Sequence, residues 1–159
     1  MDYSIRPVRR SDAAAIAEIH RAVGWWEHLA RETLEQTTQR VEQHIALCLG
    51  DGSHAIWVAA DPADHVVGYT AVHWVAYLTL PGPEGFVSEV FVHPDHQGRG
   101  IGSRLLEIVR REAIQIGCYR LSLNNVRKRE SYQRGYYLKQ GFIERSEVAD
   151  FIRILPPAE

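Results

Sequence analysis

The chain has 159 residues, of which 45% are hydrophobic and 24% are charged. These fractions exclude a disordered chain, a collagen and a coiled coil, and the length suits one domain over residues 1–159 that buries roughly 68–70% of its unfolded surface. The 18 Lys and Arg residues against 20 Asp and Glu residues give a net charge of −2, so we expect no nucleic acid as a partner.

Membrane segments and cysteines set further expectations. No stretch approaches the ~20 consecutive apolar residues of a membrane-spanning helix, and the chain does not open on a charged and then apolar leader. We therefore expect no membrane partner and a cytoplasmic protein. Cys48 and Cys118 stand far apart in apolar surroundings, which favours two buried free thiols over a disulfide or a metal pair.

The first part of the chain predicts one strand and two helices. A strand over 3–6 stops at Pro7, and Ser11 and Asp12 can then cap a helix that Gly24 ends. A second helix ends near Cys48. The apolar positions that recur at helical spacing are Ile16, Ile19 and Val23 in the first helix, and Leu34, Val41, Ile45 and Cys48 in the second.

The remaining elements alternate between strands and helices. Strands are predicted over 54–60, 66–74 and 86–92, the first two joined as a hairpin. An amphipathic helix begins near Gly100 and ends at Gly117. A short strand over 119–123, a helix over 130–140 that ends at Gly141, and a last strand within 142–155 follow. The apolar stripe of the long helix is Ile101, Leu105, Ile108, Val109, Ala113 and Ile116.

This order, β-α-α-β-β-β-α-β-α-β, indicates the fold class. Sequential strands pair with their neighbours, whereas the strand–helix–strand crossover over 86–123 requires a parallel pair. The prediction is an α/β (α+β) fold with a single mixed, mostly antiparallel sheet flanked by helices.

A glycine-rich segment at the start of the long helix carries the strongest chemical signal. The first turn of a helix offers unpaired N–H groups at the positive end of the helix dipole, and glycines let a ligand approach the backbone, which suits a pyrophosphate. Arg99 adds a positive charge. A P-loop is excluded because Gly102 is followed by Ser103 and Arg104 instead of lysine, and the glycines at 98, 100 and 102 lack the Rossmann spacing.

The residues of this segment resemble a known family. The string Gln97-Gly98-Arg99-Gly100-Ile101-Gly102 is similar to the Q/R-x-x-G-x-G/A signature of the GCN5-related N-acetyltransferases (GNAT), and the strand end Val92-His93-Pro94 precedes it as in that family. The stretch from Tyr137 to Phe142 resembles the family's Y-x-K-x-G-F ending. The order of elements also fits from residue 3 to about 155.

The resemblance implies transfer of an acetyl group from acetyl-CoA to a small-molecule or peptide amine, without a metal or a covalent intermediate. It implies that the strands over 86–92 and 119–123 splay apart into a parallel unit that holds the acyl-CoA. Asn125 is a candidate to bind the pantetheine, and the basic run 127–129 either reaches the 3′-phosphate or forms a solvated face. The residues implied to bind acetyl-CoA are Phe91, Val92, Gln97, Gly98, Arg99, Gly100, Ile101, Gly102, Ser103 and Asn125.

Two residues are candidates for the proton transfers. The attacking amine must be neutral, so a carboxylate base is useful, and the leaving thiolate benefits from a proton. Glu89 stands in an apolar strand, on a face that alternation would share with Val87 and Phe91, and either acts as this base or forms an ion pair. Tyr137 matches the family's tyrosine and either protonates the sulfur or packs in the core.

Other aromatic residues are candidates for the acceptor site. Trp25 and Trp26 lie between the first two helices, where the family builds the wall of that site, and His73 either lines the site or packs in the sheet. His93 and His96 suggest a metal only weakly, so we expect no metal. Transfer to a protein or tRNA-linked amine and a catalytically silent acyl-CoA-binding module are the alternative functions, and a homodimer stays open.

Overall fold

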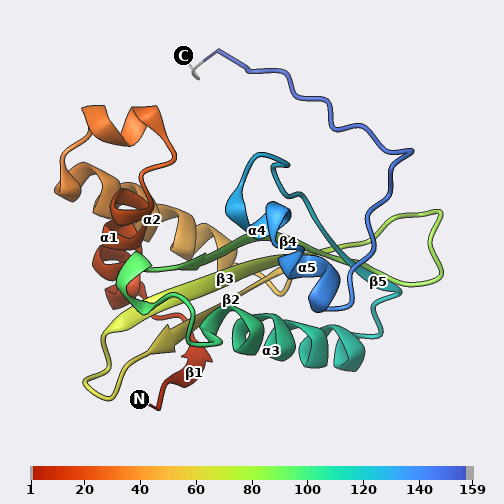
Figure 1. Ribbon diagram of the computed structural model, residues 1–159, viewed down its shortest axis with the longest axis horizontal. Helices are drawn as coiled ribbons and strands as arrows, with labels where there is room; N and C mark the ends of the chain where they lie inside the picture. Colours follow the sequence, from red (N-terminus) through yellow and green to blue (C-terminus); the bar gives the residue numbers. More distant parts are fainter. Residues whose placement is uncertain (1, 157–159) are drawn as a thin grey trace. The chain divides into compact units, whose positions relative to one another are not determined.

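The computed structural model describes residues 2–156 and contains a five-stranded mixed sheet. The strands lie side by side in sequence order, as Figure 1 shows. The first four are antiparallel and the fifth is parallel to the fourth. This confirms the predicted mixed, mostly antiparallel sheet with one parallel β-α-β unit. The strands are β1 (Ser4–Pro7), β2 (His54–Ala60), β3 (Val66–Val75), β4 (Glu84–Val92) and β5 (Arg120–Leu123).

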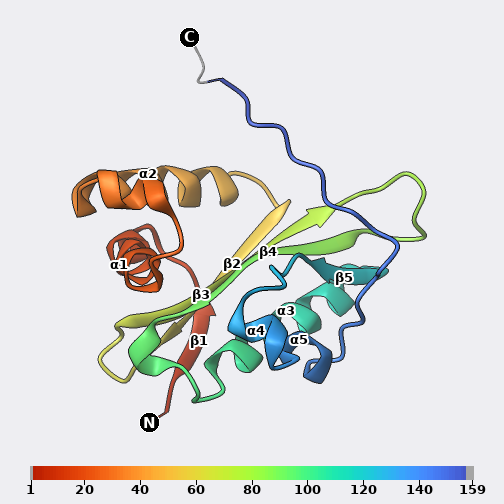
Figure 2. The ribbon, with the colours of Figure 1, turned by 45° about the horizontal axis from the view of Figure 1, so that its top comes forward.

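Helices cover both faces of this sheet (Figure 2). On one face α1 (Ala13–Val23) and α2 (Leu34–Cys48) pack their apolar stripes on β2 and β3, with Ile16, Ile19 and Ile45 in the cluster. On the other face α3 (Ile101–Ile116) buries Ile101 and Leu105. Alternate residues of a strand point to opposite faces of the sheet. A single strand such as β2 therefore contributes side chains both to the core under α1 and α2 and to the core under α3.

The predicted helices agree with the observed ones at their glycine ends. Gly24 (φ 69°) and Gly117 (φ 82°) both adopt the left-handed conformation that ends α1 and α3. Two predicted core positions differ: Leu34, the first residue of α2, and Ile116, in the last turn of α3, are exposed, whereas Leu106 is buried. Between α1 and α2 lies a short 3-10 helix, η2 (Glu27–Arg31).

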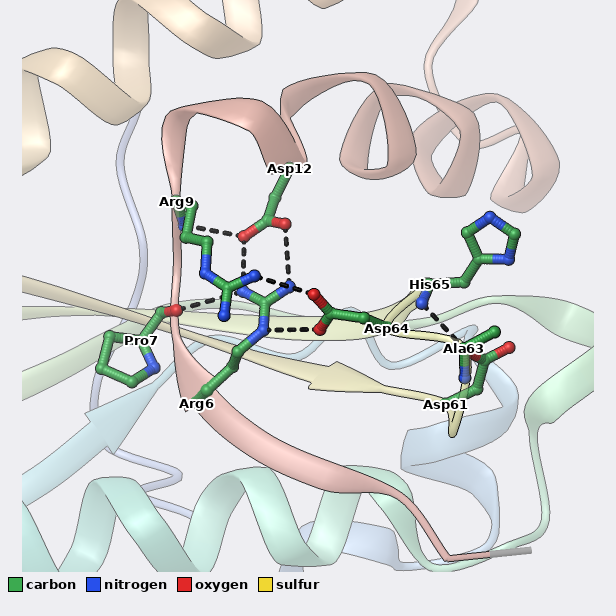
Figure 3. Close-up of polar contacts among 8 residues, drawn as sticks. All are labelled: Arg6, Pro7, Arg9, Asp12, Asp61, Ala63, Asp64 and His65. Atoms are coloured by element: carbon green, nitrogen blue, oxygen red, sulfur yellow. Dashed lines mark hydrogen bonds and ion pairs between the residues drawn. The ribbon is translucent and has the colours of Figure 1, made fainter.

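Asp12 does not cap α1 with its side chain, contrary to the prediction. Its carboxylate instead turns back to Arg6 on β1, which it binds through both oxygens at 2.8 and 3.0 Å, and accepts the Arg9 N–H. Arg6 and Arg9 also bind Asp64 in the β2–β3 hairpin, as Figure 3 shows. These bonds hold the pKa of Asp64 below its usual value, and they tie the start of α1, preceded by η1 (Arg10–Asp12), to the sheet.

A second compact unit begins at Asn125. The predicted helix over 130–140 is two short helices, α4 (Glu130–Gln133) and α5 (Tyr136–Lys139), because Gly135 between them takes a left-handed conformation (φ 63°). The predicted last strand is wrong: residues 142–156 contain no strand. A strand needs a neighbouring strand to form hydrogen bonds with its N–H and C=O groups. Among the described residues of this unit, the regular elements are the two single-turn helices α4 and α5, which offer no such neighbour.

None of the helices within residues 2–156 combines the length and the apolar character that crossing a bilayer requires.

Candidate active site

The loop that leads into α3 leaves its backbone accessible. After β4 comes a single 3-10 turn, η3 (Pro94–His96), and then Gly98 (φ 72°) and Gly100 (φ 76°), both left-handed. A Cβ built on either glycine meets no atom within 4 Å, so there is open space beside the backbone. The Arg104 N–H bonds to the Gly100 carbonyl at 3.1 Å and closes the first turn of α3. The amides before it have no carbonyl to bond within the helix, and such a loop fits a pyrophosphate.

The side chains around this loop are held by the protein. The Arg99 guanidinium donates to the Tyr3 hydroxyl at 2.9 Å and to the Asp95 carbonyl at 3.0 Å. The Gln97 amide donates to the carbonyl of Val92 at 3.1 Å, so this carbonyl at the end of β4 is engaged within the protein. Arg99 therefore places a fixed positive charge beside the loop.

β4 and β5 separate after a short paired stretch. The parallel register runs from Glu84↔Arg120 to Val87↔Leu123 and stops there. Glu84 is buried and binds both Arg120 and Ser122 on β5, which fastens the two strands at this end. From Glu89 to Val92, β4 pairs only with β3 within residues 2–124 of the first unit. One edge of β4 is thus open beside Phe91.

A β-bulge in β4 decides where Glu89 points. Ala71 on β3 is opposite Glu89, but the next residue, Val72, is opposite Val87, so Ser88 is an extra residue without a partner. The predicted alternation is therefore wrong for Val87, which lies on the α3 face with Val72. Glu89 and Phe91 lie on the face covered by α1 and α2.

Glu89 ends a chain of partly buried hydrogen bonds. The Tyr69 hydroxyl donates to Glu89 Oε2 at 2.8 Å, and His20 Nε2 lies 2.6 Å from the same hydroxyl. Because the single phenol proton goes to Glu89, His20 Nε2 is the donor in the second bond. Burial lowers the pKa of His20 and, together with the Glu89 charge, raises the pKa of Tyr69 well above its ordinary value. At neutral pH the chain therefore joins a neutral imidazole and a neutral phenol to Glu89.

This chain borders a cavity of about 280 Å³ between the sheet and the two N-terminal helices. His73, one of the predicted acceptor residues, lines the cavity, and its Nε2 is hydrogen-bonded to Ser88 Oγ at 2.7 Å. Burial lowers the pKa of His73, and the neighbouring His54 lowers it further. The lining residues come from α1, α2, β2, β3 and β4: Ile16, His20, Arg40, Val41, His44, Ile45, Leu47, Cys48, His54, Ala55, Ile56, Tyr69, Ala71, Val72, His73, Ser88 and Glu89.

Trp25 and Trp26 lie against Phe91, outside the set of residues that line the cavity. Their ring centroids are 5.4 and 5.2 Å from that of Phe91, and Trp26 also contacts His20 at 5.4 Å. Aromatic pairs at such edge-to-face geometry stabilise each other. The two tryptophans therefore flank the strand end that carries Glu89.

Tyr137 and Asn125 belong to the second compact unit and are described within it. After α5 the Gly141 N–H bonds to the Leu138 carbonyl, and the Phe142 N–H bonds to the Tyr137 carbonyl at 3.1 Å. With Gly141 left-handed (φ 86°), this is a Schellman motif. The Tyr137 and Phe142 rings are in contact, with centroids 6.0 Å apart, so the Y-x-K-x-G-F pattern corresponds to a helix end that fixes the tyrosine.

Burial and the neighbouring Tyr136 raise the pKa of Tyr137 to about 12, against a smaller lowering by Arg129. Its hydroxyl therefore stays protonated at physiological pH. Asn125 accepts a hydrogen bond from the Ser131 hydroxyl at 3.2 Å, and Arg127, in the basic run, pairs with Glu144 at 2.7 Å.

His93 and His96, the two histidines of the loop, form hydrogen bonds within the protein. His96 Nδ1 is bonded to the Tyr3 hydroxyl at 3.1 Å, and the His93 side chain accepts the Asp95 N–H. Over residues 2–156, no three His, Cys, Asp or Glu side chains are grouped so as to hold a metal ion.

His20, Tyr69 and Arg40 were missed from the sequence. Each lies on an element that was predicted correctly. They form part of the site through contacts between residues far apart in the chain, and His20 and Tyr69 are 49 positions apart. A signal was present for Tyr69, which alternates with Ala71 and His73 on one face of β3.

Comparison with known proteins agrees with this geometry. The model of the acetyltransferase (GNAT) family matches residues 19–142. The chain is 29% identical to the aminoglycoside N(6′)-acetyltransferase type 1 of Stenotrophomonas maltophilia over 98% of this chain and 95% of that protein.

Solved structures share the fold. A transcriptional regulator from Bacillus halodurans C-125 superposes with a TM-score of 0.81 at 21% identity, covering 97% of this chain and 100% of that one. The protein AAC(6′)-Iy, solved in complex with the bisubstrate analogue CoA-S-monomethyl-acetylneamine, has a TM-score of 0.72 at 17% identity, covering 98% of this chain and 100% of that one. Because the family model spans most of the sequence, the chain belongs to the GNAT family and is an N-acetyltransferase.

Proposed function

We propose that this enzyme moves an acetyl group from acetyl-CoA to the primary amine of a small molecule or peptide that enters the cavity beside Glu89. The observation that carries the proposal is the position of Glu89, whose carboxylate faces the cavity two residues before Phe91 on the open edge of β4. In the reaction a bond forms between nitrogen and the acetyl carbon, the carbon–sulfur bond breaks, and the amine proton leaves to a base.

Both compact units would serve a single N-acetyltransferase domain over residues 1–159. The family match supports this, because it runs from residue 19 to 142 and crosses the boundary at Asn125. In this arrangement the second unit contributes Tyr137 and Asn125 to the reaction.

The loop before α3 fits the pyrophosphate of acetyl-CoA, which would supply the activated acetyl group. The fit rests on the open space beside Gly98 and Gly100 and on the amides of the first helical turn. We assign Gln97, Gly98, Arg99, Gly100, Ile101, Gly102 and Ser103 to the phosphates, and Phe91, Val92 and Asn125 to the pantetheine arm.

Replacing Gly100 should test this assignment. Gly100→Ala puts a methyl group into the open space where the phosphates would lie, and we expect acetyl-CoA affinity to fall about 10- to 100-fold, the effect of losing a hydrogen bond to a charged group. Calorimetric titration measures it.

The matched control is Gly117→Ala at the other end of the same helix. This glycine has a similar φ (82° against 76°) and equally open surroundings, so both variants carry the same backbone strain of about 1–2 kcal/mol. Acetyl-CoA affinity should be normal in Gly117→Ala. Equal affinities in the two variants would show that the phosphates bind elsewhere.

Glu89 is the proposed base, and its surroundings prepare it for that role. Tyr69 holds Oε2 in place, and Oε1 is the atom that we assign to the amine proton. His73 lines the acceptor cavity, and we assign Trp25 and Trp26 to the acceptor site because they contact Phe91, two residues after Glu89 on β4.

Tyr69 would then be a positioning residue. Tyr69→Phe keeps the ring but removes the hydroxyl between His20 and Glu89, and we expect kcat/KM to fall about 10-fold, corresponding to one hydrogen bond to a charged group. Because Tyr69 acts through Glu89, Tyr69→Phe should have little further effect in a Glu89→Gln background. Additive losses in the double variant would mean that Tyr69 contributes by another route.

A further inference from the structure

The walls of the acceptor cavity are mainly apolar. Ile16, Val41, Ile45, Ile56 and Ala71 line it, contributed by two helices and two strands. Its volume of about 280 Å³ is just below the usual range of about 300–1,000 Å³ for small-molecule sites. A compact ligand with an apolar body fits these walls.

The charges of the cavity are few. Among the described residues that line it, Glu89 supplies the one carboxylate and Arg40 the one guanidinium. Arg40 is bonded at 2.7 Å to Glu32, which is not among the lining residues. The other polar groups are the imidazoles of His20, His44, His54 and His73, the Tyr69 hydroxyl and the Ser88 hydroxyl.

This charge set distinguishes between amines. Glu89 can neutralise a single ammonium group as the acceptor enters. A second ammonium on the same compact molecule would lose part of its hydration without a carboxylate partner and would share the cavity with Arg40, which repels it.

We propose that the acceptor of this enzyme is a compact monoamine, with one primary ammonium group on an alkyl or aryl body, and not a polycationic amine. The inference rests on the proposed function, since it takes the cavity beside Glu89 as the acceptor site. The proposed acceptor differs from an aminoglycoside, the substrate named for the Stenotrophomonas maltophilia relative, because an aminoglycoside carries several amino groups.

The test compares amines of matched size, using the intact protein and release of the CoA thiol. Butylamine and 1,4-diaminobutane share a four-carbon chain and differ by one ammonium group. We expect kcat/KM for butylamine to exceed that for 1,4-diaminobutane by about 10-fold, the effect of leaving a partly desolvated ammonium without a carboxylate partner. Along the series from propylamine to pentylamine, kcat/KM should rise about fourfold per methylene, the effect of burying one such group, and 2-phenylethylamine should also be accepted.

A designed change in the wall strengthens the test. Leu47 lines the cavity and is 73% exposed, so Leu47→Glu should add a second carboxylate without loss of stability. It should raise kcat/KM for 1,4-diaminobutane by about twofold to fivefold relative to butylamine. Leu49→Glu is the control, because Leu49 is exposed but does not line the cavity.

The outcomes are distinct. Preferential acetylation of 1,4-diaminobutane or kanamycin would overturn the monoamine proposal and leave the acetyltransferase function standing. An equal response of the two leucine variants would show that the acceptor binds away from this cavity. Absence of thiol release with every amine would overturn the proposed function, and this inference with it.

Discussion

Tyr137→Phe is expected to lower kcat by about 10²- to 10⁴-fold, the usual effect of losing a group that supplies a proton in the transition state. The substitution removes one hydroxyl and keeps the ring, which the Schellman motif and Phe142 hold in place. Acetyl-CoA affinity and the free energy of unfolding should therefore change little. Steady-state kinetics and calorimetric titration of acetyl-CoA check the two halves of this prediction.

The adjacent tyrosine is the control. Tyr136 and Tyr137 differ by about 100° in direction around the helix, so Tyr136→Phe should keep nearly normal kcat. Because the pKa of Tyr137 is raised to about 12, kcat should also show no decline from loss of the phenol proton up to about pH 10. A loss of kcat in Tyr136→Phe but not in Tyr137→Phe would mean that Tyr136, and not Tyr137, is the acid. A normal kcat in both variants would mean that no tyrosine of this pair supplies the proton.

Glu89→Gln is expected to produce a loss of similar size, about 10²- to 10⁴-fold in kcat/KM, and the loss should depend on pH. Below the pKa of the acceptor amine, the amine is protonated and needs a base, so the defect should be largest there. Above that pKa the amine is already neutral, and the rate of the variant should approach that of the wild type. A pH–rate profile with butylamine measures the lower limb, and one with trifluoroethylamine, a primary amine that is neutral at physiological pH, measures the upper limb.

The pH dependence separates a base from a structural role. Glutamine has the shape of glutamate, and its amide oxygen can still accept the Tyr69 bond, so packing should be preserved. Within residues 2–156 Glu89 has a hydrogen bond from Tyr69 and forms no ion pair with Arg or Lys. A defect that is constant across pH would point to positioning of the acceptor and not to proton removal.

The sequence predicted those parts of the fold that depend on local patterns. The bounds of β2 and the ends of α1 and α3 were correct, because hydrophobic periodicity and a left-handed glycine act within a few residues. The bulge at Ser88 was not predictable, since it depends on the register between β3 and β4. The final strand was predicted from apolar residues alone, and a strand also requires a pairing partner.

The candidate site divides in the same way. The loop from Gln97 to Ser103 could be singled out because its residues are contiguous in the sequence, and its assignment to the phosphates stays a prediction. The structure adds that Gly98 and Gly100 are left-handed. The cavity was not found, since it is assembled from five elements. Even Glu89, identified as a carboxylate in an apolar strand, was placed on a face shared with Val87 that the bulge does not allow.

Product analysis tests the central claim most directly. The protein is mixed with acetyl-CoA and butylamine, and released CoA thiol and N-acetylbutylamine are quantified together over time. The account predicts that the two products appear in equal amounts, and that both nearly disappear in Glu89→Gln at pH values below the pKa of the amine. Thiol release without acetylated amine, or tight acetyl-CoA binding without turnover of any amine, would contradict it.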